Sequence, residues 1–369
     1  MIYQKHIKIL KQGVEVWNKW REKYPETQPH LAFADLTEAD LRGINLENAR
    51  LSDVNLTGAN LSNANLVGAN LSNANLSGIK MSSANLAGAA LNNASLNHAA
   101  LMSSAFNDAT LVNAKLYRAD LRGAILANAD LSQADLSGAV LSYAMLHAAH
   151  LRNADLRNAD LSYANFSMAD LRGAILTNTD MSHASLNMAD LHIANLSLAT
   201  LIATDLRHAN LSFATLAGAN LCHTVLTFAT LTGADLTDTI MRSTHFGDRD
   251  FREMKGLDTV RHTGPSPVSL NSLYFSQGEI SPVFMRGTGT PDTFIESLST
   301  LKMCPTDTCT YRLRYSDKDQ EFAERLYTDL QKHGLRCCLD PLKADEQIKH
   351  ALDEPLRPHD RLVLVISEH

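Results

Sequence analysis

The chain has 369 residues, with 33 Lys and Arg against 40 Asp and Glu, and a formal net charge of −7. This charge excludes a general nucleic-acid binder, because such proteins neutralise phosphates with Lys and Arg. The five cysteines are too few and too irregularly spaced for a disulfide framework, which indicates a reducing, cytoplasmic compartment. We find no secretory signal and no run of about 18 apolar residues, so we expect no membrane span.

Residues 1–30 are predicted to form an amphipathic capping helix. One helical stripe over residues 2–23 contains four apolar residues: Ile7, Leu10, Val14 and Trp17. Pro25 and Pro29 end this helix. Because the helix leads directly into a repeat, we expect it to cover the open end of that repeat. A membrane-surface helix or a targeting peptide is the alternative interpretation.

A large apolar residue, usually Leu, falls on every fifth position from Leu36 to Phe246 without a break in phase. Two residues before most of them is a small residue, usually Ala, and the residue between is often Asp or Asn. A period of five gives an apolar face on neither an α-helix nor a flat strand. It buries one side only if the chain bends after each unit. Residues 31–251 are therefore predicted to form an all-β solenoid with Leu and Ala inside.

This pattern resembles that of the pentapeptide repeat family. The resemblance implies a right-handed quadrilateral β-helix with four pentapeptide units per coil. The period alone also permits three sides, but like residues recur four units apart, as in Tyr143 and Tyr163 or Met168 and Met188. Phe246 and Phe251 are bulky enough to plug the last coil. We find no metal cluster, phosphate loop or nucleophile motif, so we expect no catalytic, cofactor-binding or metal site on the rod.

One apolar cluster at outward positions is the candidate surface for a protein partner or for self-association. Its members are Met168, Met188, Ile193, Leu198, Ile202, Phe213 and Phe228. Equivalent positions in earlier coils carry mostly Asn, Gly or Ser, and a contiguous exposed apolar patch usually marks a contact. Two other interpretations stay open: the following linker folds back over these coils, or the cluster is neutral drift.

Some pentapeptide repeat proteins mimic DNA and occupy the DNA groove of a type II topoisomerase such as gyrase. Residues 34–246 contain 17 acidic and 11 basic residues, a net of 11 − 17 = −6. Duplex DNA of the same length, about 50 Å, carries roughly 30 charges. DNA mimicry is therefore the weaker alternative.

Residues 252–307 are rich in Gly, Pro, Ser and Thr, and are predicted to be a linker with short ordered pieces. Residues 308–369 are predicted to form a small α/β segment. It has strands at 310–314, 335–339 and 361–366, and a helix at 320–333. We expect one face of that helix to carry Phe322, Ala323, Leu326 and Leu330.

The last segment resembles a bacterial TIR domain, on the stretch Tyr315 to Asp319, the helix after it, Gly334 to Cys337, and Val365 to His369. The motif remnants are Tyr315, Ser316, Asp319 and Pro341. The resemblance implies either assembly with other TIR domains or NAD cleavage. The catalytic Glu of the NAD-cleaving members lies on a helix beyond the Ser-Glu-His at which this chain stops. We therefore expect a truncated, degenerate and non-catalytic TIR unit.

These observations predict a non-enzymatic, cytoplasmic interaction scaffold without a cofactor, whose partner is another protein or a second copy. The alternative from the enzyme class is a TIR-domain NAD hydrolase or signalling protein of which this chain is a fragment.

Overall fold

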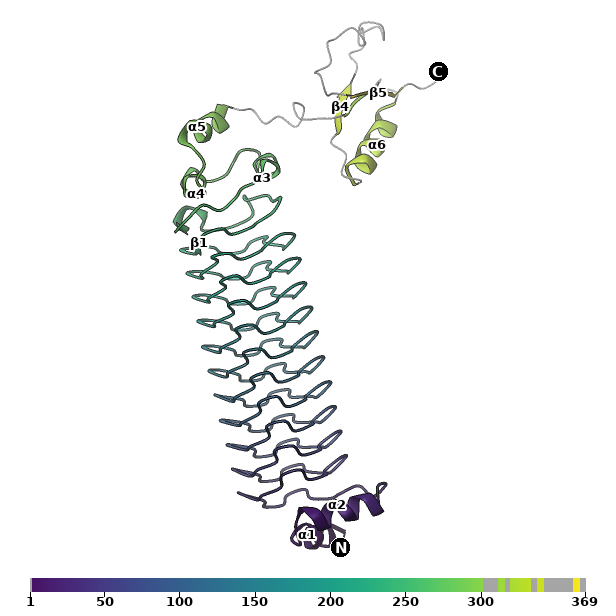
Figure 1. The fold of residues 1–369 in the computed structure, drawn as a ribbon. Helices are drawn as coiled ribbons and strands as arrows, with labels where there is room; N and C mark the ends of the chain where they lie inside the picture. The colour runs from purple at the N-terminus through teal and green to yellow at the C-terminus, as the bar shows by residue number, and fades with distance from the viewer. Residues whose placement is uncertain (1, 301–310, 316–318, 333–336, 342–360, 366–369) are drawn as a thin grey trace. The chain divides into compact units, whose positions relative to one another are not determined.

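The computed structural model describes residues 2–300, 311–315, 319–332, 337–341 and 361–365. The chain divides into two compact units, Met1–Ile295 and Glu296–His369, and Figure 1 shows the elements of both.

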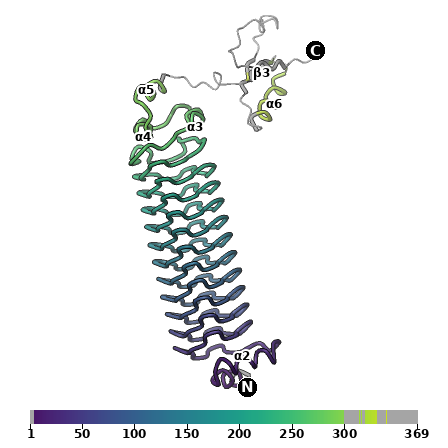
Figure 2. The backbone as a smooth tube through the Cα atoms, in the orientation of Figure 1, coloured from purple at the N-terminus to yellow at the C-terminus, as the bar shows by residue number. Residues whose placement is uncertain are grey.

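The first unit is a solenoid built from the pentapeptides. Parallel bridges join Asp35 to Asn55 and Asn55 to Asn75, and this register continues along the repeat. Within it, the backbone N–H of Leu36 donates to the carbonyl of Asn55 at 2.8 Å. Four pentapeptides therefore complete one coil, so the solenoid has four sides and not three. Figure 2 shows the coils stacked along one axis.

Each corner is a tight turn whose second residue has a left-handed backbone. The N–H of Ala59, for example, donates to the carbonyl of Leu56 at 3.0 Å and closes the turn between them. The second turn residue has a positive φ at every fifth position, from Phe33 (φ 61°) to Ser243 (φ 49°). A positive φ at this place is the signature of a type II turn, which favours Gly and Asn. The corner chemistry of the sequence thus follows from the backbone.

The interior is filled by the repeated Leu and Ala side chains, which are almost completely buried. Thr204, Thr224 and Thr244 replace Ala at one inward position in three successive coils. The hydroxyl of Thr224 donates to the carbonyl of Leu201 at 2.6 Å. Because each threonine hydroxyl donates to a carbonyl of the preceding coil, this inward row remains hydrogen-bonded although it is buried.

Two helices, α1 (Ile2–Leu10) and α2 (Val14–Lys23), cover the N-terminal end of the rod. The prediction of one helix over residues 2–23 was wrong, because the chain turns at Gly13, whose φ of 106° is not helical. The apolar stripe that the sequence predicts is therefore divided between the two helices. Among the side chains that the structure describes, His6 and Leu10 of α1 and Trp17 and Arg21 of α2 are buried.

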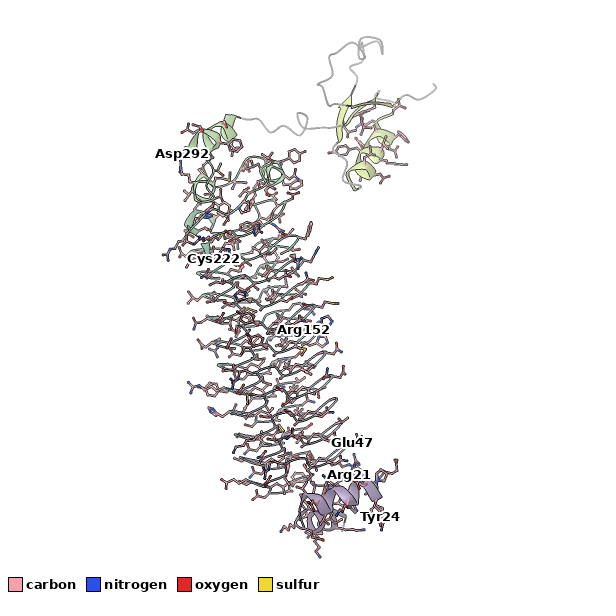
Figure 3. The ribbon with its side chains drawn as sticks, viewed as in Figure 1. Arg21, Tyr24, Glu47, Arg152, Cys222 and Asp292 are labelled. Atoms are coloured by element: carbon pink, nitrogen blue, oxygen red, sulfur yellow. The ribbon has the colours of Figure 1, made fainter. Side chains whose placement is uncertain are left out.

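Side chains of α2 hydrogen-bond with the exposed backbone edge of the first coil. The indole of Trp17 donates to the carbonyl of Asn45 at 2.7 Å. The amide of Asn18 donates to the carbonyl of Gly43 and accepts from the N–H of Asn45. Arg21 donates to the carbonyl of Glu47 at 3.0 Å, and Figure 3 shows the two residues together. The helix thus acts as the cap that an open solenoid end requires.

The C-terminal end of the rod is capped by residues predicted to be a linker. Strand β1 (Ile240–Met241) pairs in parallel with β2 (Arg261–His262), so the chain makes part of one more coil. A 3-10 helix, η1 (Leu257–Thr259), lies between them in sequence. Helices α3 (Leu270–Phe275), α4 (Pro282–Gly287) and α5 (Asp292–Thr300) follow.

Aromatic packing closes this end, as predicted for two of its rings. Phe246 and Phe251 are buried with their ring centroids 5.2 Å apart, and Phe284 of α4 packs 5.3 Å from Phe251. Residues 252–287 thus pack at the end of the rod. They do not fold back over the apolar cluster, whose corner residues are exposed. For residues 252–295, the part of the predicted linker that belongs to this unit, that alternative interpretation was wrong.

The second unit contains a three-stranded parallel sheet in the order β4-β3-β5. Its elements are β3 (Tyr311–Tyr315), α6 (Gln320–Lys332), β4 (Cys337–Pro341) and β5 (Arg361–Val365). The core is formed by Leu313, Tyr315 and Ala323, with Leu326, Tyr327, Leu330 and Leu339 packed against it. The predicted helix face was partly wrong, because Phe322 is exposed and Tyr327 packs instead.

Tyr315 and Pro341 of the predicted TIR-like motif lie opposite each other in the register of β3 and β4. Asp319, which directly precedes α6, is buried. Ser316 lies outside the described residues. None of the helices in the described segments is long and apolar enough to cross a membrane.

Candidate interaction surface

The coil register stacks corner residues into columns along the rod. The 168 column contains Met168, Met188, His208 and Phe228. The 193 column, at the next corner, contains Ile193 and Phe213. His208 and Phe228 stack with centroids 4.9 Å apart, and Phe213 meets His192 edge-on at 5.8 Å. The structure therefore brings most of the predicted cluster together on two adjacent edges.

These apolar side chains are exposed. Met168 is 53% exposed, Ile193 57% and Phe228 70%. Equivalent positions of the 168 column in earlier coils are occupied by Asn48, Gly68, Gly88, Asp108, Asn128 and Ala148. The apolar edge is thus a local feature of the last coils.

The same residues occupy the left-handed backbone region. Met168 has φ 63°, Ile193 φ 55° and Phe228 φ 62°. This region costs about 1–2 kcal/mol for residues with a Cβ, and it is a marked outlier for β-branched or bulky side chains. Backbone strain and solvent exposure therefore coincide at these corners.

Two residues of the predicted cluster lie apart from the two columns. Leu198 is exposed at the next corner, where its side chain leans over Gly218. Ile202 occupies the first position of a turn and is only half-exposed. The surface that the structure supports is therefore smaller than the predicted cluster.

A polar side of the coil lies between the two columns. Its middle row contains Asp170, Asp190, Asn210 and Thr230. Arg172 donates to Asp170, and Asn210 donates to Asp190 at 2.9 Å. Arg152, labelled in Figure 3, also pairs with Asp170. Within these four coils, the charges thus lie in the half with Asp170 and Asp190, and the half with Asn210 and Thr230 is neutral.

Many carboxylates of the rod are engaged within their own pentapeptide. The guanidinium of Arg207 hydrogen-bonds to Asp205 and holds the pKa of that carboxyl below its ordinary value. Arg122 does the same for the pKa of Asp120. These paired charges reduce the acidic field of the rod, which is unlike the uninterrupted charge of a DNA backbone.

A hollow of about 420 Å³ lies beside the C-terminal cap. Arg249 lines it and donates to the carbonyls of Leu226, Ala229 and Phe246, and burial lowers the pKa of its guanidinium. The carboxylate of Glu253 accepts from Thr232 at 2.6 Å. Arg249 thus closes the end of the backbone ladder, which is a structural role.

The sequence analysis noted that Tyr143 and Tyr163 are one coil apart, but it did not identify the aromatic stack that they form on another edge. Tyr143, Tyr163 and His183 stack with centroids 4.9 and 4.8 Å apart and nearly parallel rings. Their spacing of one full coil in the sequence was the signal that could have revealed the stack. Over the described ranges, no group of His, Cys, Asp and Glu is arranged to hold a metal ion.

These features define a capped repeat solenoid followed by a small α/β unit. Models of pentapeptide repeats match eight overlapping stretches of residues 34–242, more than half of the chain. The chain therefore belongs to the pentapeptide repeat family. A TIR domain model matches residues 313–369, so the chain also carries a C-terminal TIR domain.

Several solved structures are similar. HetL, a pentapeptide repeat protein involved in heterocyst differentiation regulation in the cyanobacterium Nostoc sp. strain PCC 7120, is 32% identical, with a TM-score of 0.37. The match covers 61% of this chain and 96% of HetL. Full-length QnrB1, a plasmid-mediated fluoroquinolone resistance protein, is 23% identical with a TM-score of 0.23, covering 51% of this chain and 90% of QnrB1. No curated protein matches the chain.

Proposed function

We propose that this protein is a non-enzymatic, cytoplasmic interaction scaffold. Its rod presents the 168 and 193 columns to a protein partner, and its TIR domain links that contact to TIR-type signalling. The observation that carries the proposal is the coincidence of apolar character, exposure and left-handed backbone at Met168, Ile193 and Phe228.

The energetic argument concerns what these residues contribute in the free protein. A bulky residue in the left-handed region destabilises the rod, and an exposed side chain recovers little of that cost by burial. Asn or Gly at the same corner avoids the strain, as at Asn128 and Gly88. Contact with a partner would bury the side chains and offset the strain. Hot spots of protein interfaces are enriched in such large side chains.

The residues of the rod also favour a binding role over a catalytic role. Leu and Ala fill its inward positions, and the carboxylates of Asp120 and Asp205 are held by neighbouring arginines. A rigid rod of this kind lets outward residues change without changing the fold.

Affinity capture from source cells, with crosslinking, tests the proposal. The triple variant Met188→Asn, Phe213→Asn and Phe228→Asn should lose the captured partner, while it keeps the circular dichroism spectrum of the wild type. Asn178→Asp is the matched control, since Asn178 is an exposed corner residue with φ 59° outside the two columns. Equal recovery of the partner by the triple variant would overturn the proposed role of the columns.

The TIR domain match favours one second candidate function, cleavage of NAD. Incubating the full chain with NAD and following nicotinamide release distinguishes the two. We expect release at the rate of a heat-denatured sample. Faster release by the folded chain would favour the enzyme.

A further inference from the structure

We propose that a second copy of this chain covers the 168 and 193 columns, with the two rods antiparallel. The inference rests on the proposed function, because it names the partner of the same surface. The two-fold axis lies in the shared face, perpendicular to the rods, between the coil of Met188 and the coil of His208. Such an axis maps each column onto itself in the opposite direction.

The spacing of apolar residues suits this axis in both columns at once. Within the 168 column, Met168 of one copy faces Phe228 of the other, and Met188 faces His208. In the 193 column, Ile193 lies in the coil of Met188, and Phe213 lies in the coil of His208. The same axis therefore sets Ile193 against Phe213. The apolar stretches of the two columns are therefore centred at the same height along the axis of the rod.

The polar row between the columns is complementary in the same arrangement. The carboxylate of Asp190 faces the amide of Asn210, and the carboxylate of Asp170 faces the hydroxyl of Thr230. Each pair sets a hydrogen-bond donor against an acceptor. A parallel pair of rods would instead set Asp190 against Asp190, whose side chain is more exposed than that of Asp170. Like charges at an interface disfavour association, so the charge pattern selects the antiparallel arrangement.

Complementary charges meet at the ends of this surface. Glu253 lies one coil beyond Thr232, because its carbonyl accepts from Gly233 and its carboxylate accepts from Thr232. On the opposite side of the axis, the matching position one coil before Arg172 is Arg152. The guanidinium of Arg152 is half-exposed. Arg152 of each copy therefore faces Glu253 of the other.

The area is close to what a stable dimer needs. Five large side chains of the two columns, each more than half exposed, offer roughly 600 Å² if a large side chain covers about 200 Å² when fully exposed. The polar row and the Arg152 and Glu253 ends add to this value. A standard interface buries about 800 Å² per partner.

Exchanging charges between facing positions tests both the dimer and its register. Met168→Lys and Phe228→Glu lie three coils apart in one chain, roughly 14 Å, so they cannot pair within it. In the antiparallel dimer of the double variant, the new lysine of each copy faces the new glutamate of the other. By sedimentation velocity of the full chain, we expect each single variant to raise the dimer Kd at least about tenfold. The double variant should return to within about threefold of the wild type.

Asn178→Lys is the control, because it adds the same charge at a left-handed corner of the opposite side, in the coil of Met168. It should leave the Kd unchanged. A second pair, Arg152→Glu and Glu253→Arg, should show the same loss and rescue without touching the apolar columns.

Three results would overturn this inference. They are a wild type that stays monomeric at about 100 µM, a dimer indifferent to both single variants, and a double variant without rescue. The proposed function survives any of these if cell capture still recovers a different protein that the triple variant loses.

Discussion

The second turn residue of each pentapeptide determines what a corner tolerates. Asn and Gly fit its left-handed backbone, and the sequence places them at most corners of the early coils. The period of five therefore predicts both which residues point inward and where the backbone must turn. The period alone does not show which corner residues lie together on one edge, since that depends on the number of pentapeptides per coil.

At the same scale, Leu136→Asp tests the inward assignment. Leu136 is fully buried, and an unpaired carboxylate there should cost several kcal/mol. We expect a large drop in the melting temperature followed by circular dichroism. Gln133→Asp is the matched control, because Gln133 is an exposed corner residue with φ 60° in the same coil. Equal melting of the two variants would contradict the inward assignment.

Other single residues could not be predicted from the pattern. His6 and Arg21 are buried because they face the first coil across the helix break at Gly13, which the stripe of apolar residues does not reveal. Phe322 is exposed because α6 turns Ala323 and Leu326 toward the sheet. In each case the tertiary neighbour, absent from the local sequence, decides the burial.

Among the elements, the two caps solve the same problem differently. At the N-terminal end, side chains of α2 replace the missing coil, as when Asn18 both donates to and accepts from the first coil. At the C-terminal end, a backbone segment continues the register, and β2 pairs with β1. The composition of residues 252–307 indicates a linker, because this segment has no period by which its pairing could be recognised.

The C-terminal cap contains an imidazole whose two ring nitrogens are buried. Among the described residues, neither ring nitrogen of His262 has a hydrogen-bond partner, and the ring lies against Phe284. A side chain at Gly287 would collide with it, so glycine allows α4 to approach. Burial lowers the pKa of His262.

This shift predicts that the cap loosens in acid. A lowered pKa means that the unfolded cap binds the proton more tightly than the folded cap. The associated stability is therefore present above pH of about 6.5, the ordinary value for histidine, and is lost as the pH falls toward the folded pKa. Hydrogen-exchange protection of residues 257–287 should fall between neutral pH and about pH 5, after correction for intrinsic rates. His262→Leu should remove that dependence. A pH profile unaffected by this substitution would show that a group other than His262 causes the loosening.

For the whole molecule, most of the ion pairs that the described residues form are local. Among these residues, six arginines pair with an Asp two residues earlier: Arg42, Arg122, Arg157, Arg172, Arg207 and Arg252. Arg152 and Arg172 also pair with an Asp of the next coil. Exposed pairs of this kind contribute little to stability, because solvent screens them. The backbone register and the Leu and Ala interior therefore dominate the stability of the rod.

Salt should consequently have little effect on the rod. Raising NaCl from about 0.05 to 0.5 M should move its melting temperature by less than about 3 °C, although it screens surface charges. Differential scanning calorimetry measures this directly. A fall of about 8 °C or more would show that the Asp–Arg pairs hold the coils together.

Because four pentapeptides complete one coil, the number of pentapeptides also determines the direction in which each edge of the rod faces. One pentapeptide is a quarter-turn of the coil, so inserting a single unit between Asp130 and Leu131 would swing the 168 column by one side relative to the N-terminal cap. Inserting a whole coil would lengthen the rod and leave the orientation of every edge relative to the cap unchanged. In relatives that differ by whole coils, a binding edge would keep its orientation relative to the N-terminal cap. In relatives that differ by a single pentapeptide, the same edge would be rotated about the rod axis by one side of the coil.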